Sequence, residues 1–397
     1  MSVTSGFGST LRAALRPGST VALGDGVGTL RSLDDGTDVC SALSDAAREI
    51  GSIRLVLGWS PTPLPGLEVD AFTEVIALMP GWGVRAVLAG GARYVPTSLA
   101  AISPLLNGPL RPDLLVTRLV ERDGALHFGT EVSWQAELAD SGVPVLAVLD
   151  DTGPSASACP PVRSHSVRIA AHTDDGPAQL ATKEPEPLHD ALAEQVLRLV
   201  PPGARLQYGP GQLGTALLRN VQVPLQIDTG LLTDAVVDLD CHGLLAGCPS
   251  ATYLMGTDRL YEWADTRPIL RGIDYTHDIS RLSGGDPFIA VNTALEIDPF
   301  GQINVEGSGE KVVGGIGGHP DYCAAGRLSR QGLSIIAVPS RLDGRTPLVA
   351  KLSRPASTPA HNVDVVVTED GYADLRRADW TERTKLICSL FEKGEGQ

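Results

Sequence analysis

The sequence of 397 residues predicts an α/β protein made of two similar open α/β domains that face each other across a cleft. Two observations predict this class. Short apolar runs bounded by turn residues alternate with segments that suit helices, which is typical of parallel sheets covered by helices. The chain also repeats itself, since residues 17–30 read PGSTVALGDGVGTL and residues 202–215 read PGARLQYGPGQLGT. We expect an N-terminal domain over residues 1–185 and a C-terminal domain over residues 186–397.

The internal repeat combines a Pro-Gly pair, a β-rich run and a Gly-x-Gly turn. Gly24 and Gly26 in the first copy correspond to Gly209 and Gly211 in the second, at one constant offset. In both copies the turn is expected to open a helix, as in a strand–turn–helix unit. Gene duplication explains this shared context better than chance does.

Short apolar runs with turn residues on both sides predict the buried strands. In the first half the expected strands are Arg54–Gly58, Val84–Leu88, Leu114–Thr117 and Val145–Leu149, with helices over Ala42–Ile50 and Trp134–Ala139. In the second half strands are expected near Leu206, Leu225, Ala235, Phe288, Ile335 and Val363. A stretch rich in Pro, Asp, Thr and Glu, Ala171–His189, is the expected linker, and a helix over Asp190–Leu199 follows it. Ligands of such folds bind beyond the carboxyl ends of the strands.

The composition excludes several classes of protein. The formal net charge is −15, so the chain offers no broad basic surface for nucleic acid or for an anionic membrane. The N-terminal segment lacks the apolar core of a secretion signal, and no run of 18 apolar residues occurs, so we expect a cytoplasmic protein. Six scattered cysteines then predict free thiols rather than disulfides. No CxxC or HExxH pattern occurs, and we expect no metal site.

The second glycine turn predicts a binding loop for a phosphate-bearing ligand. The segment Gly209-Pro210-Gly211-Gln212-Leu213-Gly214 fits the pattern GxGxxG. Glycines let the backbone approach a pyrophosphate, and a helix that begins near Leu213 would direct its positive end toward that group. Asp228, at the end of the next strand, lies where a ribose-binding acid would lie in a dinucleotide-binding unit. Nicotinamide binding, a simple tight turn and a loop for coenzyme A are therefore all consistent with this segment.

Two blocks of the second half carry more specific motifs. Val291–Tyr322 reads VNTALEIDPFGQINVEGSGEKVVGGIGGHPDY, and Pro224–Leu239 reads PLQIDTGLLTDAVVDL. The first is similar to I-N-S-A-x-E-V-D-x-x-G-Q-V-N followed by G-I-G-G-Q-x-D-F, and the second to G-I-H-T-E-M-x-S-D-G-V-V-D-L. Both patterns belong to the acetyl-CoA hydrolase and 4-hydroxybutyrate CoA-transferase family of class I CoA-transferases, which the chain resembles over nearly all of residues 185–385. The resemblance implies that both domains are of the CoA-transferase type.

The resemblance also implies that the family's nucleophile is missing. The shared D-x-V-V-D-L fixes the alignment and places the catalytic glutamate of the family at Gly230. In the family this glutamate attacks the acyl-CoA carbonyl, and a glutamyl-CoA thioester forms next. Gly230 has no side chain for this step, so the chain would be a divergent member lacking the catalytic Glu. Asp228 stands at the family's histidine and, two residues away on a strand, faces the same side as position 230.

Other candidate site residues also follow from the resemblance. Coenzyme A, as substrate or thioester, is the implied ligand, and its expected contacts are Gly209, Pro210, Gly211, Gln212, Leu213, Gly314, Gly317 and Gly318. His319 replaces a family glutamine and is a candidate acid or base. Glu296 matches a family glutamate that is not the nucleophile, and together with Asp228 it is a candidate relocated carboxylate. Arg341 or Arg345 is the candidate replacement for a lysine of the family.

Three functions are consistent with these residues. We expect an acyl-CoA-processing enzyme that acts without a glutamyl-CoA intermediate, by hydrolysis or by chemistry next to the thioester. One alternative is a CoA-transferase in which Asp228 or Glu296 has become the nucleophile. The other is a non-catalytic paralogue that binds CoA esters. A homodimer is a further expectation, because dimers are common in the family. The sequence indicates neither the acyl group nor the acceptor.

Overall fold

The computed structural model describes residues 6–342 and 344–392, which form two compact units. The first unit comprises the described residues up to Thr97, then Ala101–Gln179 and Thr252–Asp274. The second unit comprises Ser98–Ala100, Leu180–Ala251 and the described residues from Tyr275 onward. The expected single division after residue 185 assigns Thr252–Asp274 to the C-terminal domain, whereas in the structure this segment clusters with the first unit.

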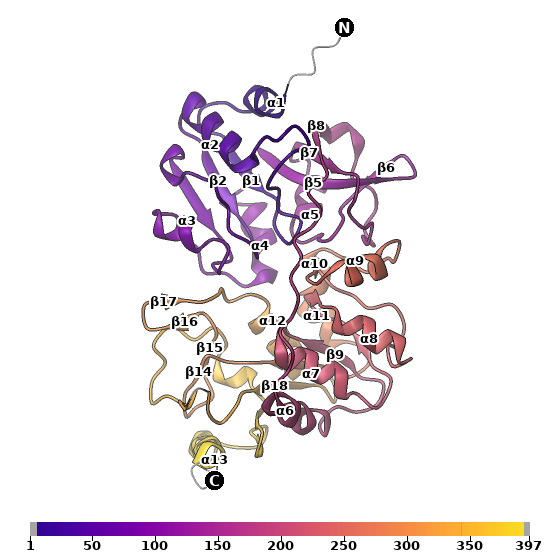
Figure 1. The fold of residues 1–397 in the computed structure, drawn as a ribbon. Coiled ribbons are helices and arrows are strands. Elements are labelled where there is room, and N and C mark those ends of the chain that lie inside the picture. The colour runs from indigo at the N-terminus through magenta and orange to yellow at the C-terminus, as the bar shows by residue number, and fades with distance from the viewer. Residues whose placement is uncertain (1–5, 343, 393–397) are drawn as a thin grey trace. The chain divides into compact units, whose positions relative to one another are not determined.

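The first unit is built on a parallel sheet with the strand order β4-β3-β2-β1-β5-β7-β8 (Figure 1), and β6 extends β5 as an antiparallel hairpin. The strands are β1 (Thr20–Leu23), β2 (Arg54–Leu57), β3 (Glu74–Ala77), β4 (Arg93–Tyr94), β5 (Leu114–Arg122), β6 (Ala125–His127), β7 (Val145–Asp150) and β8 (Val167–Thr173). The central strands are apolar and buried on both faces, as expected for a parallel sheet with helices on its two sides.

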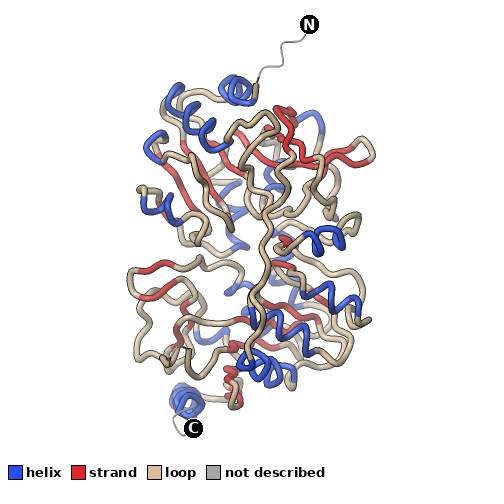
Figure 2. The backbone as a smooth tube through the Cα atoms, in the orientation of Figure 1, coloured by secondary structure: helices blue, strands red, loops and turns tan. Residues whose placement is uncertain are grey.

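The second unit repeats this plan with the order β10-β9-β13-β18-β19-β20, in which β20 alone runs antiparallel to its neighbour. Its strands are β9 (Arg205–Tyr208), β10 (Gln226–Ile227), β13 (Phe288–Asn292), β18 (Leu333–Ala337), β19 (Val365–Thr368) and β20 (Gly371–Asp374). Two small hairpins, β14–β15 (Glu296–Ile297 and Ile303–Asn304) and β16–β17 (Gly307–Ser308 and Lys311–Val312), follow β13. Figure 2 shows that the chain around these hairpins is mostly loop.

Helices connect the strands, and most of them are short. They are α1 (Phe7–Ala14), α2 (Val39–Ile50), α3 (Arg85–Ala89), α4 (Leu99–Leu106), α5 (Gln135–Asp140), α6 (Pro187–Leu197), α7 (Gln212–Asn220), α8 (Ala235–Cys241), α9 (Asp258–Ala264), α10 (Ile273–Thr276), α11 (Ile279–Ser283), α12 (His319–Leu328) and α13 (Trp380–Glu392). The chain also forms short strands β11 (Leu231–Leu232) and β12 (Tyr253–Leu254). In the second unit α6 and α7 pack against each other, as Figure 1 shows.

The two sheets confirm the predicted pair of similar α/β folds. The parallel order β2-β1-β5-β7-β8 of the first unit corresponds strand for strand to β10-β9-β13-β18-β19 of the second. The repeated glycine turns follow β1 and β9, the matching strands, and Gly26 and Gly211 both have positive φ, at 88° and 113°. The expectation that both turns open a helix is half wrong. In the second unit α7 begins directly after Gly211, but in the first unit α2 begins only at Val39.

Two predicted strands are helices in the structure. Val84–Leu88 lies largely in α3, and Ala235 begins α8, so Cys241 and His242 end a helix rather than follow a strand. Both runs are short and apolar, and a buried helix of five to seven residues cannot be told from a buried strand by its apolar residues alone. The expected linker Ala171–His189 is also shorter than predicted, because β8 continues to Thr173 and α6 begins at Pro187.

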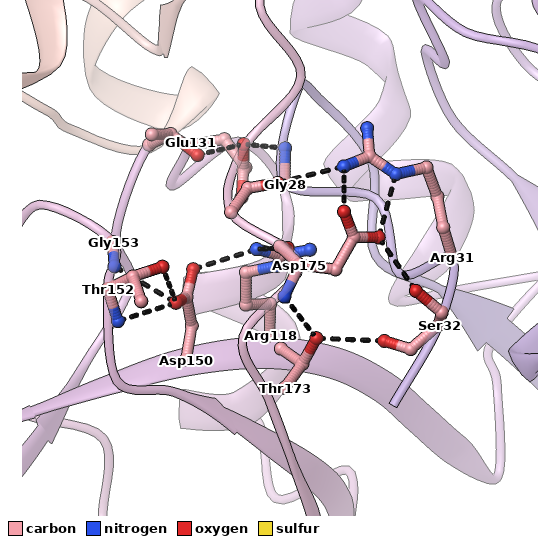
Figure 3. A network of polar contacts seen from close by, with 12 residues as sticks. Gly28, Arg31, Ser32, Arg118, Glu131, Asp150, Thr152, Gly153, Thr173 and Asp175 are labelled. Carbon is pink, nitrogen blue, oxygen red and sulfur yellow. Dashed lines mark hydrogen bonds and ion pairs between the residues drawn. The ribbon is translucent and has the colours of Figure 1, made fainter. Parts of the chain in front are cut away.

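A polar network joins β5, β7 and the loop after β8 in the first unit (Figure 3). Arg118 is buried, and its Nη1 donates to Asp150 Oδ2 and to the carbonyl oxygen of Asp175, both at 2.7 Å. The Asp175 carboxylate in turn accepts two hydrogen bonds from Arg31, at 2.6 and 2.9 Å. Buried charges are tolerated when they are paired, so this network fixes the loops at the carboxyl edge of the first sheet.

Candidate functional site

A cavity of about 930 Å³ lies at the carboxyl edge of the second sheet. Its walls include residues that follow three neighbouring parallel strands, β9, β13 and β18. The lining residues include Gly209, Pro210, Gln212, Leu213 and Gly214 after β9, Thr293 to Glu296 after β13, and Pro339, Leu342, Arg345, Thr346, Pro347 and Val349 after β18. This is the position at which open parallel α/β sheets bind their ligands.

The predicted glycine loop forms one wall of this cavity. β9 ends at Tyr208, and α7 begins at Gln212, with Gly211 as the residue that precedes the helix. A Cβ built on Gly209 or on Gly211 would meet no atom within 4 Å, so the missing side chains leave open space beside the backbone. Gly211 has no side chain to cap α7, which leaves N–H groups of the first helical turn for an anionic group.

The surroundings of Gly230 are polar and closely packed. Gly230 follows β10, and a Cβ on it would lie 3.1 Å from Tyr322 Oη and 3.3 Å from His277 Nε2. A Cβ on Gly318 would lie only 2.5 Å from the same nitrogen, so the imidazole edge occupies space that a side chain at position 318 would need. The position matched to the family's glutamate therefore faces an imidazole and a phenol.

His277 and Tyr322 form a buried pair. They are 1% and 4% exposed, and their ring centroids lie 4.7 Å apart. His277 Nδ1 pairs with Thr276 Oγ1 at 2.9 Å, whereas His277 Nε2 and Tyr322 Oη have no hydrogen-bond partner in the described part of the chain. Burial, helped by the charge of Arg281, lowers the pKa of His277 to about 3. Burial also raises the pKa of Tyr322 well above its ordinary value, so both rings are neutral near pH 7.

Neither member of this pair was predicted from the motifs. His277 directly follows the Asp-Tyr-Thr of residues 274–276, and Tyr322 stands at the end of the glycine-rich block. The position of each residue next to a motif was the only signal in the sequence that could have pointed to it. Their meeting at Gly230 depends on the packing of α11 against α12, which no local pattern contains.

Asp228 is held between two arginines. Arg281 donates to both carboxylate oxygens at 2.8 Å, and Arg205 Nη1 lies 3.3 Å from Oδ2. The Asp228 side chain is 8% exposed. Both carboxylate oxygens are therefore engaged, and an attack by this side chain would first have to break its contacts with the two arginines.

Glu296 lines the cavity, but its carboxylate is occupied. It accepts hydrogen bonds from Ser353 N at 2.8 Å and Ser353 Oγ at 2.7 Å, and from Asn304 Nδ2 at 2.8 Å. Burial alone would raise the pKa of Glu296, but these donors outweigh it and lower the pKa below the ordinary value. The contacts describe an ionised side chain that anchors the hairpin β14–β15 to the segment around Ser353.

His319 also lines the cavity and also has partners at both nitrogens. Its Nδ1 lies 2.7 Å from Thr358 Oγ1, and its Nε2 lies 3.0 Å from the carbonyl oxygen of Thr293. Burial lowers the pKa of His319 to about 4. The ring is therefore neutral near pH 7 and hydrogen-bonded within the protein.

The remaining predicted contacts fall into two groups. Gly209, Pro210, Gln212 and Leu213 line the cavity, together with the candidate cation Arg345. The cavity wall, so far as the chain is described, does not include Gly211, Gly314, Gly317, Gly318 or the other candidate cation, Arg341. Instead Gly318 lies against His277, as described above, and the carbonyl oxygen of Gly317 accepts a hydrogen bond from Leu99 N.

No group of three or more His, Cys, Asp or Glu side chains in the described residues is placed to hold a metal ion. No described helix is both long and apolar enough to cross a membrane.

Comparison with known proteins defines the class of this chain. Residues 256–391 match the model of the acetyl-CoA hydrolase/transferase C-terminal domain. The chain is 25% identical to 4-hydroxybutyrate coenzyme A transferase from Clostridium kluyveri. The alignment covers 77% of this chain and 76% of that protein. It is 27% identical to succinyl-CoA:cyclohexane-1-carboxylate CoA transferase from Geobacter metallireducens, in an alignment that covers 82% of this chain and 78% of that protein. Acetyl-CoA hydrolase from Candida albicans is 30% identical, in an alignment that covers 46% of this chain and 37% of that hydrolase.

Solved structures share the fold. The crystal structure of RipA from Yersinia pestis matches 97% of this chain and 93% of its own with a TM-score of 0.85 and 22% identity. A 4-hydroxybutyrate CoA-transferase from Porphyromonas gingivalis matches 98% of this chain and 96% of its own with a TM-score of 0.76 and 18% identity. The protein is thus an α/β protein of the CoA-transferase fold. Residues 256–391 carry the C-terminal domain of the acetyl-CoA hydrolase/transferase family, in agreement with the family that the motifs predicted.

Proposed function

We propose that this protein binds an acyl-CoA ester in the cavity of the second unit and acts on its thioester without a glutamyl-CoA intermediate. Hydrolysis is the simplest such reaction, and chemistry next to the thioester is the other. The names of the relatives support the substrate class, because they are CoA-transferases and an acetyl-CoA hydrolase. The cavity volume of about 930 Å³ is in the range of small-molecule sites.

Features of the cavity suit the phosphates of coenzyme A. Gly209 and Gly211 present backbone without side chains, and the N-terminus of α7 directs N–H groups and a positive dipole end toward its ligand. Arg345 adds a cation to the wall. In a protein of net charge −15, such local donors are needed to hold an anion.

The observation that carries the mechanism is the engagement of both candidate carboxylates. A covalent nucleophile must be free to attack a carbonyl carbon. Gly230 offers no carboxylate, Asp228 is bound by Arg281 and Arg205, and Glu296 is bound by Ser353. Releasing either anion would break its buried contacts before the reaction could begin. Direct attack by water on the thioester avoids this cost.

The experiment is a thiol-release assay on a panel of acyl-CoA esters, with and without added carboxylic acids, combined with intact mass spectrometry. We expect CoA release without a carboxylic acid acceptor and no protein–CoA adduct. An aspartyl- or glutamyl-CoA adduct would instead indicate a CoA-transferase with a relocated carboxylate. Tight CoA binding with no turnover of any ester would indicate a non-catalytic binding protein. Binding of NAD without CoA would contradict the proposed ligand.

A further inference from the structure

The pair His277 and Tyr322 has the geometry of a donor site for one oxygen atom. We propose that His277 Nε2 and Tyr322 Oη bind the carbonyl oxygen of the acyl-CoA thioester in the space beside Gly230. The proposal rests on the proposed function, because it assigns these two side chains to the same thioester. It gives the protein an oxyanion site at the position where the family has its nucleophile.

His277 Nε2 and Tyr322 Oη both lack a hydrogen-bond partner among the described residues. Both polar atoms are also buried. Buried polar atoms are nearly always paired, so an unpaired one calls for a ligand or another explanation. Here two of them converge on one point, because Tyr322 Oη and His277 Nε2 are the two polar atoms closest to the Cβ position of Gly230. Two independent losses of a partner at the same point are hard to explain by packing alone.

Two glycines, Gly230 and Gly318, leave a path by which a ligand atom can reach the two donors. Gly230 and Gly318 are partly exposed, whereas the two rings behind them are buried. A small group can therefore reach the donors past two positions that carry no side chain. His319, which lines the cavity, and Tyr322 are three residues apart on α12, a spacing that places them on neighbouring positions of one helix face. The same helix thus borders both the cavity and the donor pair.

Both donors, the imidazole of His277 and the phenol of Tyr322, are neutral near pH 7. The charged groups that act on the pair are Arg281, Asp228 and Asp321, and the Arg281 guanidinium disfavours an imidazolium. A neutral imidazole carries one proton, and the proposal places it on Nε2, with Nδ1 as the acceptor in the 2.9 Å contact with the Thr276 hydroxyl. The phenol of Tyr322 supplies the second donor. Neutral donors bind an oxygen that is gaining charge and give up no proton to it.

The reaction step balances without any further reagent. Water oxygen adds to the thioester carbon, its proton passes to solvent, and the carbonyl π electrons move onto the oxygen held by the two donors. When the tetrahedral intermediate collapses, the C–S bond breaks and the thiolate of CoA leaves and takes up a proton. The products are a carboxylic acid and free CoA. The donors stabilise the negative oxygen between these two events.

Tyr322→Phe is the direct test, because it removes one oxygen atom and keeps the ring. We expect the kcat of thiol release to fall by about a hundredfold, with the Kd for CoA unchanged. The carbonyl stretching band of bound acyl-CoA labelled with ¹³C at the thioester should lie at lower frequency in the wild-type protein and return toward its solution value in the variant. The unfolding midpoint should not decrease, because the hydroxyl has no partner to lose.

A matched pair of variants tests His277. His277→Gln keeps an N–H near the place of Nε2, and His277→Met has a similar size but no donor. We expect the glutamine variant to keep more activity than the methionine variant. Tyr372→Phe on β20 is the control for removing a tyrosine hydroxyl, since Tyr372 is half exposed and far along the chain from both residues.

The outcomes separate the two proposals. Wild-type rates in both Tyr322→Phe and His277→Met, with thiol release intact in the parent protein, would overturn the oxyanion site and leave the proposed function standing. If the parent protein binds acyl-CoA but does not turn it over, the proposed function fails, and the carbonyl band still decides whether the donors bind the oxygen. If the protein binds no acyl-CoA, both proposals fail.

Discussion

The side chains that surround Gly230, the position that the motifs align with the family's glutamate, are polar. If the site had simply decayed, apolar side chains would be expected to fill the space, because each buried polar atom without a partner costs about 1–3 kcal/mol. Instead an imidazole and a phenol face the glycine, and both are buried. Their presence favours a polar group of a ligand at this point over an empty remnant of the family's active site.

Restoring the glutamate should not restore transferase chemistry. In Gly230→Glu the new Cβ lies 3.1 Å from Tyr322 Oη and 3.3 Å from His277 Nε2, so both rings must shift by a few tenths of an ångström. The carboxylate would then accept hydrogen bonds from the same two donors. We expect thiol release to fall by about tenfold or more, with no glutamyl-CoA adduct in the intact mass spectrum. Gly230→Ala, which adds the Cβ alone, should have the smaller effect, and a trapped adduct in the glutamate variant would contradict this prediction.

Asp228→Asn should reduce stability. The amide keeps the shape but leaves Arg281 and Arg205 without their shared counter-charge in a site that is mostly buried. Removing one partner of a buried ion pair is strongly destabilising, and we expect a loss of about 2–3 kcal/mol in urea unfolding. Asp370→Asn, an exposed aspartate in the same unit, is the control. If the variant keeps the parent stability but loses all turnover, Asp228 is the relocated nucleophile after all.

The sequence could place Asp228 two residues from Gly230, but it could not supply its partners. Arg205 and Arg281 are 23 and 53 residues away along the chain. The same holds for His277, which meets Gly230 through tertiary packing. Motif spacing therefore identified the loop Gly209–Gly214 and the altered position, because these features are local. It could not tell which carboxylates are free to react, because that depends on side chains from other elements.

At the scale of elements, most of the strands that were predicted correctly are central ones, and the edge strand β10 near Leu225 is the exception. β2, β5, β7, β9, β13, β18 and β19 are apolar runs bounded by turn residues, and the sheet buries them on both faces. Where the prediction failed, at α3 and α8, the run is equally short and apolar but forms a helix. A run of five to seven apolar residues predicts that the segment is buried. It does not predict whether the buried segment is a strand or a helix.

Gly209→Ala isolates the role of the glycine loop. The new Cβ would meet no atom within 4 Å, and the backbone at Gly209 is not in the left-handed region, so the fold should tolerate the change. Because the methyl group would enter the space of a ligand at the backbone, we expect about tenfold weaker CoA binding by calorimetry, with unchanged thermal unfolding. Gly81→Ala in the first unit, which also meets no atom, is the control. Unchanged affinity in Gly209→Ala would place the phosphates elsewhere.

At the scale of the whole molecule, the two copies of one plan have diverged at the same turn. In the second unit the glycine turn after β9 borders the cavity. In the first unit the turn after β1 surrounds the buried carboxylate of Asp25, which accepts hydrogen bonds from Trp134 Nε1 at 3.0 Å and from Tyr253 Oη at 2.8 Å. Tyr253 belongs to Thr252–Asp274, so this carboxylate ties the returning segment into the first unit. One copy borders the proposed binding site, and the other holds the returning segment in the first unit.

The buried titratable groups differ between the units. In the first unit burial raises the pKa of Asp25 to about 6 and that of Glu131 to about 7. The stability that such groups contribute is complete below their unfolded pKa, near 4, and is lost as the pH rises through 6 and 7. In the second unit burial lowers the pKa of His277 to about 3 and that of His319 to about 4. Their contribution is complete above about pH 6.5 and is lost as the pH falls toward 4 and 3.

The two units should therefore respond to pH in opposite directions. Asp321 in the second unit, whose pKa burial raises to about 6, opposes the two histidines but cancels only about one of them. Between pH 5 and pH 8 we expect the first unit to lose about 4 kcal/mol of stability and the second unit to gain about 2–3 kcal/mol. Hydrogen exchange of peptides from β5 and β7, compared with peptides from β13 and β18, measures the two separately. Asp25→Asn should flatten the dependence of the first unit alone, and a change of the same sign in both units would contradict the assignment of these buried groups.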